Sequence, residues 1–108
     1  MARKKPPASD PATPAPGGAM TDEQALAELA NRPDWSLVGE TIQRTFAFAD
    51  FKSAMAFVDK VADAAESMNH HPDIMIRYNK VTMTLSTHDA GGITAKDFEL
   101  ASKMDAMV

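Results

Sequence analysis

The segment from Phe51 to Met68 constrains the fold most, because its apolar residues recur with the period of one long helix between segments that have the period of strands. Asp50 is a favourable N-cap for this helix. Pro72 disfavours helical conformation in the residue before it, so the helix should end near Asn69. We expect its methionine and phenylalanine residues to be core. The predicted core-facing positions are Phe51, Met55, Val58, Ala62 and Ala65, widened by Ala54, Val61 and Met68, with Phe57 at the edge.

The residues on both sides of this helix alternate between apolar and polar, which is typical of strands with one buried face. Two strands are predicted before the helix and two after it, each pair joined by a short turn. We expect both pairs to be hairpins. The predicted strands are residues 35–38 and 41–48 around Gly39-Glu40, and residues 74–78 and 81–85 around Asn79-Lys80.

Two shorter helices complete the chain. Thr21 and Gln24 have the spacing of a capping box, which opens a predicted helix to about Ala30. Thr94 and Asp97 have the same spacing at the start of a last helix. The resulting order, α-ββ-α-ββ-α, predicts an α+β fold: a four-stranded antiparallel sheet with helices packed on one face.

Composition predicts one domain behind a leader. Residues 1–20 hold five of the seven prolines and almost nothing apolar beyond alanine, so we expect a disordered leader and a single domain in residues 21–108. That domain carries 8 basic and 14 acidic side chains, a net −6, which disfavours direct binding to nucleic acid. No apolar stretch is long enough to cross a membrane, and the basic start lacks the apolar run of a secretory signal. We expect a cytoplasmic protein.

The three histidines of the chain, His70, His71 and His88, lie within nineteen residues. They are the side chains that ordinarily titrate near neutral pH. Because residues 74–78 and 81–85 form a predicted hairpin, the end of the second strand should return to the start of the first. We therefore expect His88 to lie near the other two. Neighbouring side chains in an extended segment point to opposite sides, so one of the adjacent pair should face a cleft and the other turn inward.

Carboxylates surround these histidines in the sequence. Glu66 lies four residues before His70, on the same predicted helix face, and Asp89 follows His88 directly. Asp97 lies in the first turn of the last helix. A carboxylate at any of these places could orient an imidazole or fix its tautomer. Equally, the histidine pair could simply complement the helix dipole, and Asp97 could serve only as the capping partner, so the spacing leaves both alternatives open.

A metal site is a further alternative, because histidines with nearby carboxylates can bind zinc or iron. However, an adjacent histidine pair separated by sixteen residues from a third matches no common zinc template. The chain has no cysteine and hence no thiolate ligand or nucleophile. We expect no metal.

The stretch from Glu66 to Asp97 resembles the signature of the pterin-4a-carbinolamine dehydratases. The pattern is an acidic residue, three others, His-His-Pro, five others, an aromatic, nine others, a histidine, and an aspartate shortly after. The likeness extends back through Trp35-Ser-Leu-Val to cover nearly all of residues 21–104. It departs from the family where Asp73 is followed by Ile74, since the family often has an aromatic there.

The resemblance implies a hydro-lyase that removes water from a 4a-hydroxytetrahydropterin to form the quinonoid dihydropterin, in recycling of a tetrahydrobiopterin-type cofactor. It implies a homotetramer built from dimers, a metabolic link to an aromatic amino-acid hydroxylase, and no cofactor beyond the pterin substrate. The alternative is a non-enzymatic interaction module, because animal members also act as dimerisation cofactors of a homeodomain transcription factor. The implied site residues are His70, His71 and His88 for catalysis, Glu66, Pro72, Thr87 and Asp89 for substrate binding, and Asp97 in support.

Overall fold

The computed structural model of this chain describes residues 18–108. Of the leader predicted for residues 1–20, residues 1–17 lie outside the described residues. Ala19 is buried, and the Met20 amide donates a hydrogen bond to the Ile93 carbonyl at 2.7 Å. The last residues of the predicted leader therefore pack on the domain. In the described part of the chain, no helix has both the length and the apolar character needed to span a membrane.

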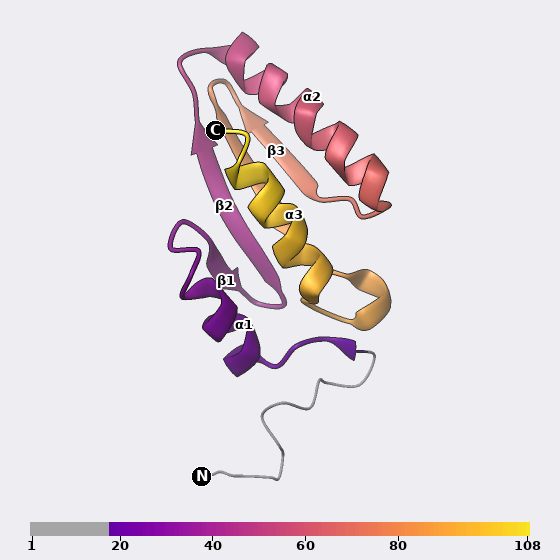
Figure 1. The fold of residues 1–108 in the computed structure, drawn as a ribbon. Helices are drawn as coiled ribbons and strands as arrows, with labels where there is room; N and C mark the ends of the chain where they lie inside the picture. The colour runs from indigo at the N-terminus through magenta and orange to yellow at the C-terminus, as the bar shows by residue number, and fades with distance from the viewer. Residues whose placement is uncertain (1–17) are drawn as a thin grey trace, which may run out of the picture.

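The structure confirms the predicted α+β fold and the order of its elements (Figure 1). The four strands form one antiparallel sheet in the order β1-β2-β4-β3, and α2 and α3 lie on the same face of it. The elements are α1 (Asp22–Leu29), β1 (Ser36–Val38), β2 (Thr41–Ala47), α2 (Phe51–Met68), β3 (Asp73–Arg77), β4 (Lys80–Leu85), the 3₁₀ helix η2 (His88–Ala90) and α3 (Ala95–Asp105).

The buried face of α2 is rotated from the predicted one, although Ala54, Val61 and Ala65 were all predicted to face the core. Its buried residues are Ala54, Phe57, Val61 and Ala65, whereas Phe51 is 46% exposed. Ala62 is also exposed, so two of the five predicted core-facing positions were wrong. The cause is Phe57, whose ring centroid lies 4.6 Å from that of Phe46 and 5.1 Å from that of Phe48, both contributed by β2 and the residue after it.

The start of α2 is as predicted. The Asp50 carboxylate accepts a hydrogen bond from the Ser53 amide at 2.8 Å, which satisfies one of the free amide groups of the first turn. The same hydrogen bond from the Ser53 backbone holds the pKa of Asp50 below its usual value.

The β3–β4 hairpin turns one residue earlier than predicted. Arg77 pairs with Lys80, so the turn residues are Tyr78 and Asn79 rather than Asn79 and Lys80. Asn79 determines this position, because its side-chain amide donates to the Phe48 carbonyl at 2.8 Å while its own carbonyl accepts from the Phe48 amide at 2.8 Å. As a result Tyr78 adopts a left-handed backbone conformation, with φ of 54°.

The strand β3 forms one edge of the sheet, and all five of its residues are exposed. Ile74, Met75 and Ile76 are 38%, 52% and 37% exposed. The predicted apolar alternation therefore identifies a strand correctly, although no face of that strand is buried.

The carboxylate of Asp105, at the end of α3, joins that helix to β2 and the loop before β1. It accepts a hydrogen bond from the Trp35 indole N–H at 2.9 Å and one from the Arg44 guanidinium at 2.6 Å. The Arg44 guanidinium also lies 4.1 Å from the centre of the Phe46 ring. These contacts explain how Arg44 interrupts the apolar alternation of β2 without leaving an unpaired charge.

We predict that Asp105→Ala lowers the free energy of unfolding by about 1–3 kcal/mol, because Trp35 is only 3% exposed and its N–H would lose its partner. Glu99→Ala is the matched control on the same helix. Its exposed pairing with Lys103 at 4.0 Å should contribute less than about 0.5 kcal/mol. Urea unfolding followed by the fluorescence of the single tryptophan measures both. Equal transition midpoints for the two variants would contradict the prediction.

Candidate functional site

The end of α2 directs His70 into the protein. Asn69 adopts a left-handed conformation with φ of 51°, and the His70 amide closes the helix by donating to the Ala65 carbonyl at 3.0 Å. Pro72 then prevents the helix from resuming. The His70 side chain is 9% exposed, and its Nε2 lies 2.5 Å from Oδ1 of Asp97 on α3.

Asp97 is fully buried and is the centre of the site. Its second oxygen, Oδ2, accepts hydrogen bonds from the Thr87 hydroxyl and from the Thr94 amide, both at 2.9 Å. The Thr87 and Thr94 hydroxyls are themselves 2.8 Å apart. One carboxylate thus joins the segment after α2, the segment after β4 and the start of α3. The positive end of the α3 dipole also favours a carboxylate at this position.

This arrangement has a consequence for the His70 imidazole. A carboxylate accepts hydrogen bonds, so Nε2 of His70 carries the proton that it shares with Asp97. In the neutral ring, Nδ1 is then the nitrogen with a free lone pair. Asp97 is therefore more than the capping partner of Thr94: it fixes the orientation and the tautomer of a buried histidine.

His71 lies on the opposite side of the chain from His70, as predicted for adjacent residues. Its side chain is 56% exposed, and its Nε2 lies 2.5 Å from Oε2 of Glu66, which is 77% exposed. Glu66 does contact an imidazole, but its predicted placement on the same helix face as His70 was wrong. The left-handed Asn69 reverses the chain, so His70 points toward α3 while His71 folds back along the last turn of α2.

His88 does not close the fourth strand, because β4 ends at Leu85 and His88 opens η2. The loop that holds it is closed by Thr87, which pairs with Gly92 through a hydrogen bond from its amide to the Gly92 carbonyl at 2.8 Å. His88 itself is exposed. Thr87 and His70 bind the same Asp97 carboxylate, so the hairpin does return His88 to the region of His70.

A hollow of about 330 Å³ lies over the start of α3 beside this carboxylate. Two of the predicted binding residues, Thr87 and Asp89, line it, whereas the three histidines do not. Thr94 and Lys96 also line it and were not among the predicted site residues. The sequence signal that could have identified Thr94 as a site residue was its capping-box spacing from Asp97. The lining residues are Gly18, Thr87, Asp89, Ala90, Thr94, Ala95 and Lys96.

Within residues 18–108, no three histidine or carboxylate side chains are grouped closely enough to hold a metal ion. The expectation that the protein needs neither a metal nor a cofactor stays a prediction.

The fold, a four-stranded antiparallel sheet with two helices on one face, is that of a solved pterin dehydratase. The sequence model of the family described as "Pterin 4 alpha carbinolamine dehydratase" matches residues 18–107. The chain belongs to this family.

Its relatives agree with that assignment. A protein of Sulfurisphaera tokodaii, provisionally named pterin-4-alpha-carbinolamine dehydratase, is 52% identical over 89 residues, which cover 82% of this chain and 96% of that protein. A protein of Picosynechococcus with the same provisional name is 51% identical over 88 residues, which cover 82% of this chain and 96% of that one.

Solved structures show the same likeness. A crystal structure of a transcriptional coactivator/pterin dehydratase from Brucella melitensis is 37% identical, with a TM-score of 0.78 over 81% of this chain and 95% of that one. A pterin dehydratase-like protein identified as a RuBisCO assembly factor in the alpha-carboxysome is 25% identical, with a TM-score of 0.55 over 67% and 83% of the two chains.

We predict that Asp97→Ala destabilises the fold by at least the contribution of one hydrogen bond to a charged group, about 1.5–3 kcal/mol, because it leaves three donors without their acceptor. Asp89→Ala removes an exposed carboxylate near the same loop and should change stability by less than about 0.5 kcal/mol. Urea unfolding of both variants tests this, and an unaltered midpoint for Asp97→Ala would show that the cluster does not hold the site together.

Proposed function

We propose that this protein removes water from a 4a-hydroxytetrahydropterin to form the quinonoid dihydropterin, by acid–base catalysis with His70, His71 and His88. In this reaction the C4a hydroxyl takes a proton and leaves as water, while N5 gives up a proton. The protons balance, and no electrons enter from outside. The observation that carries the proposal is the buried pair of His70 and Asp97, which presents one histidine in a defined tautomer.

The three histidines have environments suited to different proton transfers. His70 is buried against a carboxylate, His71 is paired with Glu66 at the surface, and His88 is exposed in η2. An enzyme that must donate one proton and accept another near neutral pH needs two titratable groups in unlike surroundings. We propose that His70 and the two exposed histidines divide these roles among them.

We propose that the pterin binds between the segment after α2 and the loop after β4. Thr87 and Asp89 line the hollow beside Asp97, and Glu66 and Pro72 flank His70 and His71 in the chain. The wider setting is also part of the proposal: a cytoplasmic enzyme in tetrahydrobiopterin-type recycling, fed by an aromatic amino-acid hydroxylase, with no cofactor other than its substrate.

A non-enzymatic interaction module is the second candidate. The observation that favours it is the Brucella relative, which is described as a transcriptional coactivator as well as a pterin dehydratase. A dehydration assay on the purified protein distinguishes the two, because a module without activity would leave the uncatalysed rate unaltered.

We predict that His71→Ala and His88→Ala each slow dehydration while leaving the thermal midpoint nearly unchanged, because both side chains are exposed. A positioned acid or base contributes about 10²–10⁴-fold, and we expect the low end because this substrate also dehydrates unaided. The double variant should lose less than the product of the single losses, since groups that act as a unit are not additive. Initial rates, with and without a chelator, and circular dichroism on the same preparations measure this.

Glutamine at the same two positions is the matched control, because it retains hydrogen bonding without carrying a proton. It should restore substrate binding more than rate. Folded alanine variants that react at the full rate would overturn the catalytic assignment. A wild-type protein that loses its activity when the chelator is added would instead have a metal-dependent mechanism.

We also propose that the protein assembles as a tetramer built from dimers, with β3 as one contact between copies. An edge strand with three consecutive exposed apolar residues offers unpaired backbone groups to a second strand. A domain of this size also buries a limited share of its surface alone.

We predict that Ile76→Asp at this edge shifts sedimentation toward smaller species at micromolar concentration. Val38→Asp, which places the same charge on an exposed valine at the opposite edge strand β1, is the control and should leave assembly unchanged. A wild-type protein that sediments as a monomer would contradict the assembly proposal outright.

A further inference from the structure

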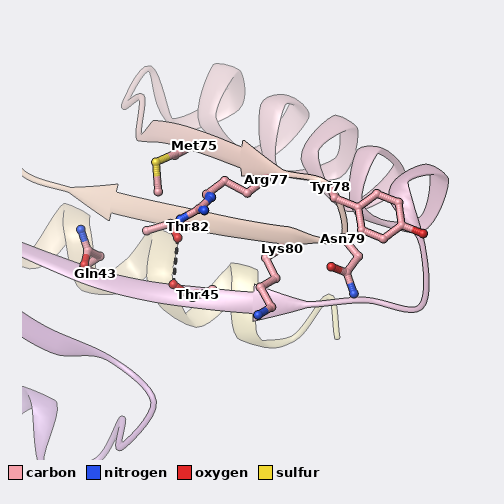
Figure 2. Close-up of a pocket in the computed structure, with 8 residues that line it drawn as sticks. All are labelled: Gln43, Thr45, Met75, Arg77, Tyr78, Asn79, Lys80 and Thr82. Atoms are coloured by element: carbon pink, nitrogen blue, oxygen red, sulfur yellow. Dashed lines mark hydrogen bonds between the residues drawn. The ribbon is translucent and has the colours of Figure 1, made fainter.

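The face of the sheet that the helices leave uncovered carries a hollow of about 800 Å³, away from the histidines (Figure 2). The residues that face the helices are the buried ones of β2 and β4, such as Ile42, Phe46 and Met83. The alternate residues of the same strands form the floor of the hollow. The lining residues are Gln43, Thr45, Met75, Arg77, Tyr78, Asn79, Lys80 and Thr82.

The floor of this hollow is polar, but most of its polar side chains already hydrogen-bond to each other or to a neighbour in the sheet. The hydroxyls of Thr45 and Thr82 are 2.8 Å apart, and the Gln43 side-chain amide donates to the Thr84 hydroxyl at 3.1 Å. The groups with hydrogen-bonding capacity to spare are therefore at the hairpin end, where Arg77 and Lys80 project over the sheet (Figure 2).

Arg77 and Lys80 are an unfavourable pair by themselves. They stand directly opposite each other in the β3–β4 ladder, and like charges in that position destabilise a sheet. Both are exposed, and among residues 18–108 no carboxylate forms an ion pair with either one. This concentration of positive charge occurs in a domain whose net charge over residues 21–108 is −6.

Tyr78, in the turn between Arg77 and Lys80, has an unfavourable backbone conformation. It is 66% exposed and has a φ of 54°, a conformation that is a genuine outlier for a bulky side chain. The contacts of Asn79 with Phe48 fix the turn at this position, so the Tyr78 ring is held at the surface, where it is free to contact a partner.

The residue types at this end of the sheet fit a protein partner better than a small molecule. Methionine, arginine and tyrosine, here Met75, Arg77 and Tyr78, are enriched at protein interfaces, and tyrosine and arginine also dominate their binding energy. Small-molecule sites are enclosed and mainly apolar, whereas this hollow is an open, polar sheet face.

We infer that the uncovered sheet face binds an acidic segment of a partner protein, with Arg77 and Lys80 pairing with its carboxylates and Tyr78 packing beside them. The surface is separate from the histidine site, so binding there is compatible with dehydration and does not depend on the proposed function.

The test is titration of a fluorescent glutamate-rich peptide into the full chain at low ionic strength. Arg77→Ala with Lys80→Ala should weaken binding about tenfold or more, because it removes two charge-assisted contacts. Lys52→Ala with Lys60→Ala, on exposed positions of α2, makes the same change in net charge away from this face and should weaken binding less than about twofold. Both double variants should dehydrate pterin at the wild-type rate.

Tyr78→Gly provides a second, independent measurement. Glycine adopts a positive φ without strain, so this variant should keep or raise the thermal midpoint while weakening peptide binding. Absence of peptide binding, an equal loss in both double variants, or tighter binding of a single-stranded oligonucleotide would each overturn the inference. A change of oligomeric state in the Arg77 and Lys80 variant without peptide binding would assign the surface to a second copy of the chain and overturn it as well.

Discussion

The buried carboxylate of Asp97 is the point on which the site depends. Three parts of the chain far apart in sequence meet there: His70 after α2, Thr87 after β4, and the first turn of α3. A buried carboxylate is costly unless its lone pairs are satisfied, and here two side chains and one backbone amide satisfy them. These hydrogen bonds offset the cost of burying Asp97. They also hold His70 and the loop of His88 in place.

The core has a comparable organising contact in Phe57. Its ring packs against those of Phe46 and Phe48, and this contact orients α2 so that Phe51 faces solvent. The inward direction of His70 follows from the left-handed cap at Asn69 and from the hydrogen bond of the imidazole to Asp97.

The two faces of the sheet have distinct characters as a result. The face toward α2 and α3 carries the apolar core, and the histidines lie at the end of the hairpin where that core meets the loops. The opposite face carries paired hydroxyls and amides and, near the Tyr78 turn, an uncompensated positive charge. A small domain thus has two chemically unlike surfaces, one near the histidines and one with two exposed basic side chains.

Much of this fold is predictable from local sequence, because periodicity, capping residues and proline act within a few residues of each other. The order of elements, the caps Thr21, Asp50 and Thr94, and the opposite directions of His70 and His71 are all of this kind. The predicted hairpin likewise implied that the chain returns His88 toward His70.

Contacts between distant residues were decided only by the tertiary structure. Glu66 accompanies His71 because of a left-handed turn at Asn69, and the β3–β4 turn lies at Tyr78 because Asn79 binds Phe48. Asp97 has the same spacing from Thr94 whether it is only a cap or also a histidine partner, and the approach of His70 across the domain makes it both. Local patterns determine which elements form, whereas side-chain partners depend on how those elements pack, since packing sets the distances between residues far apart in the chain.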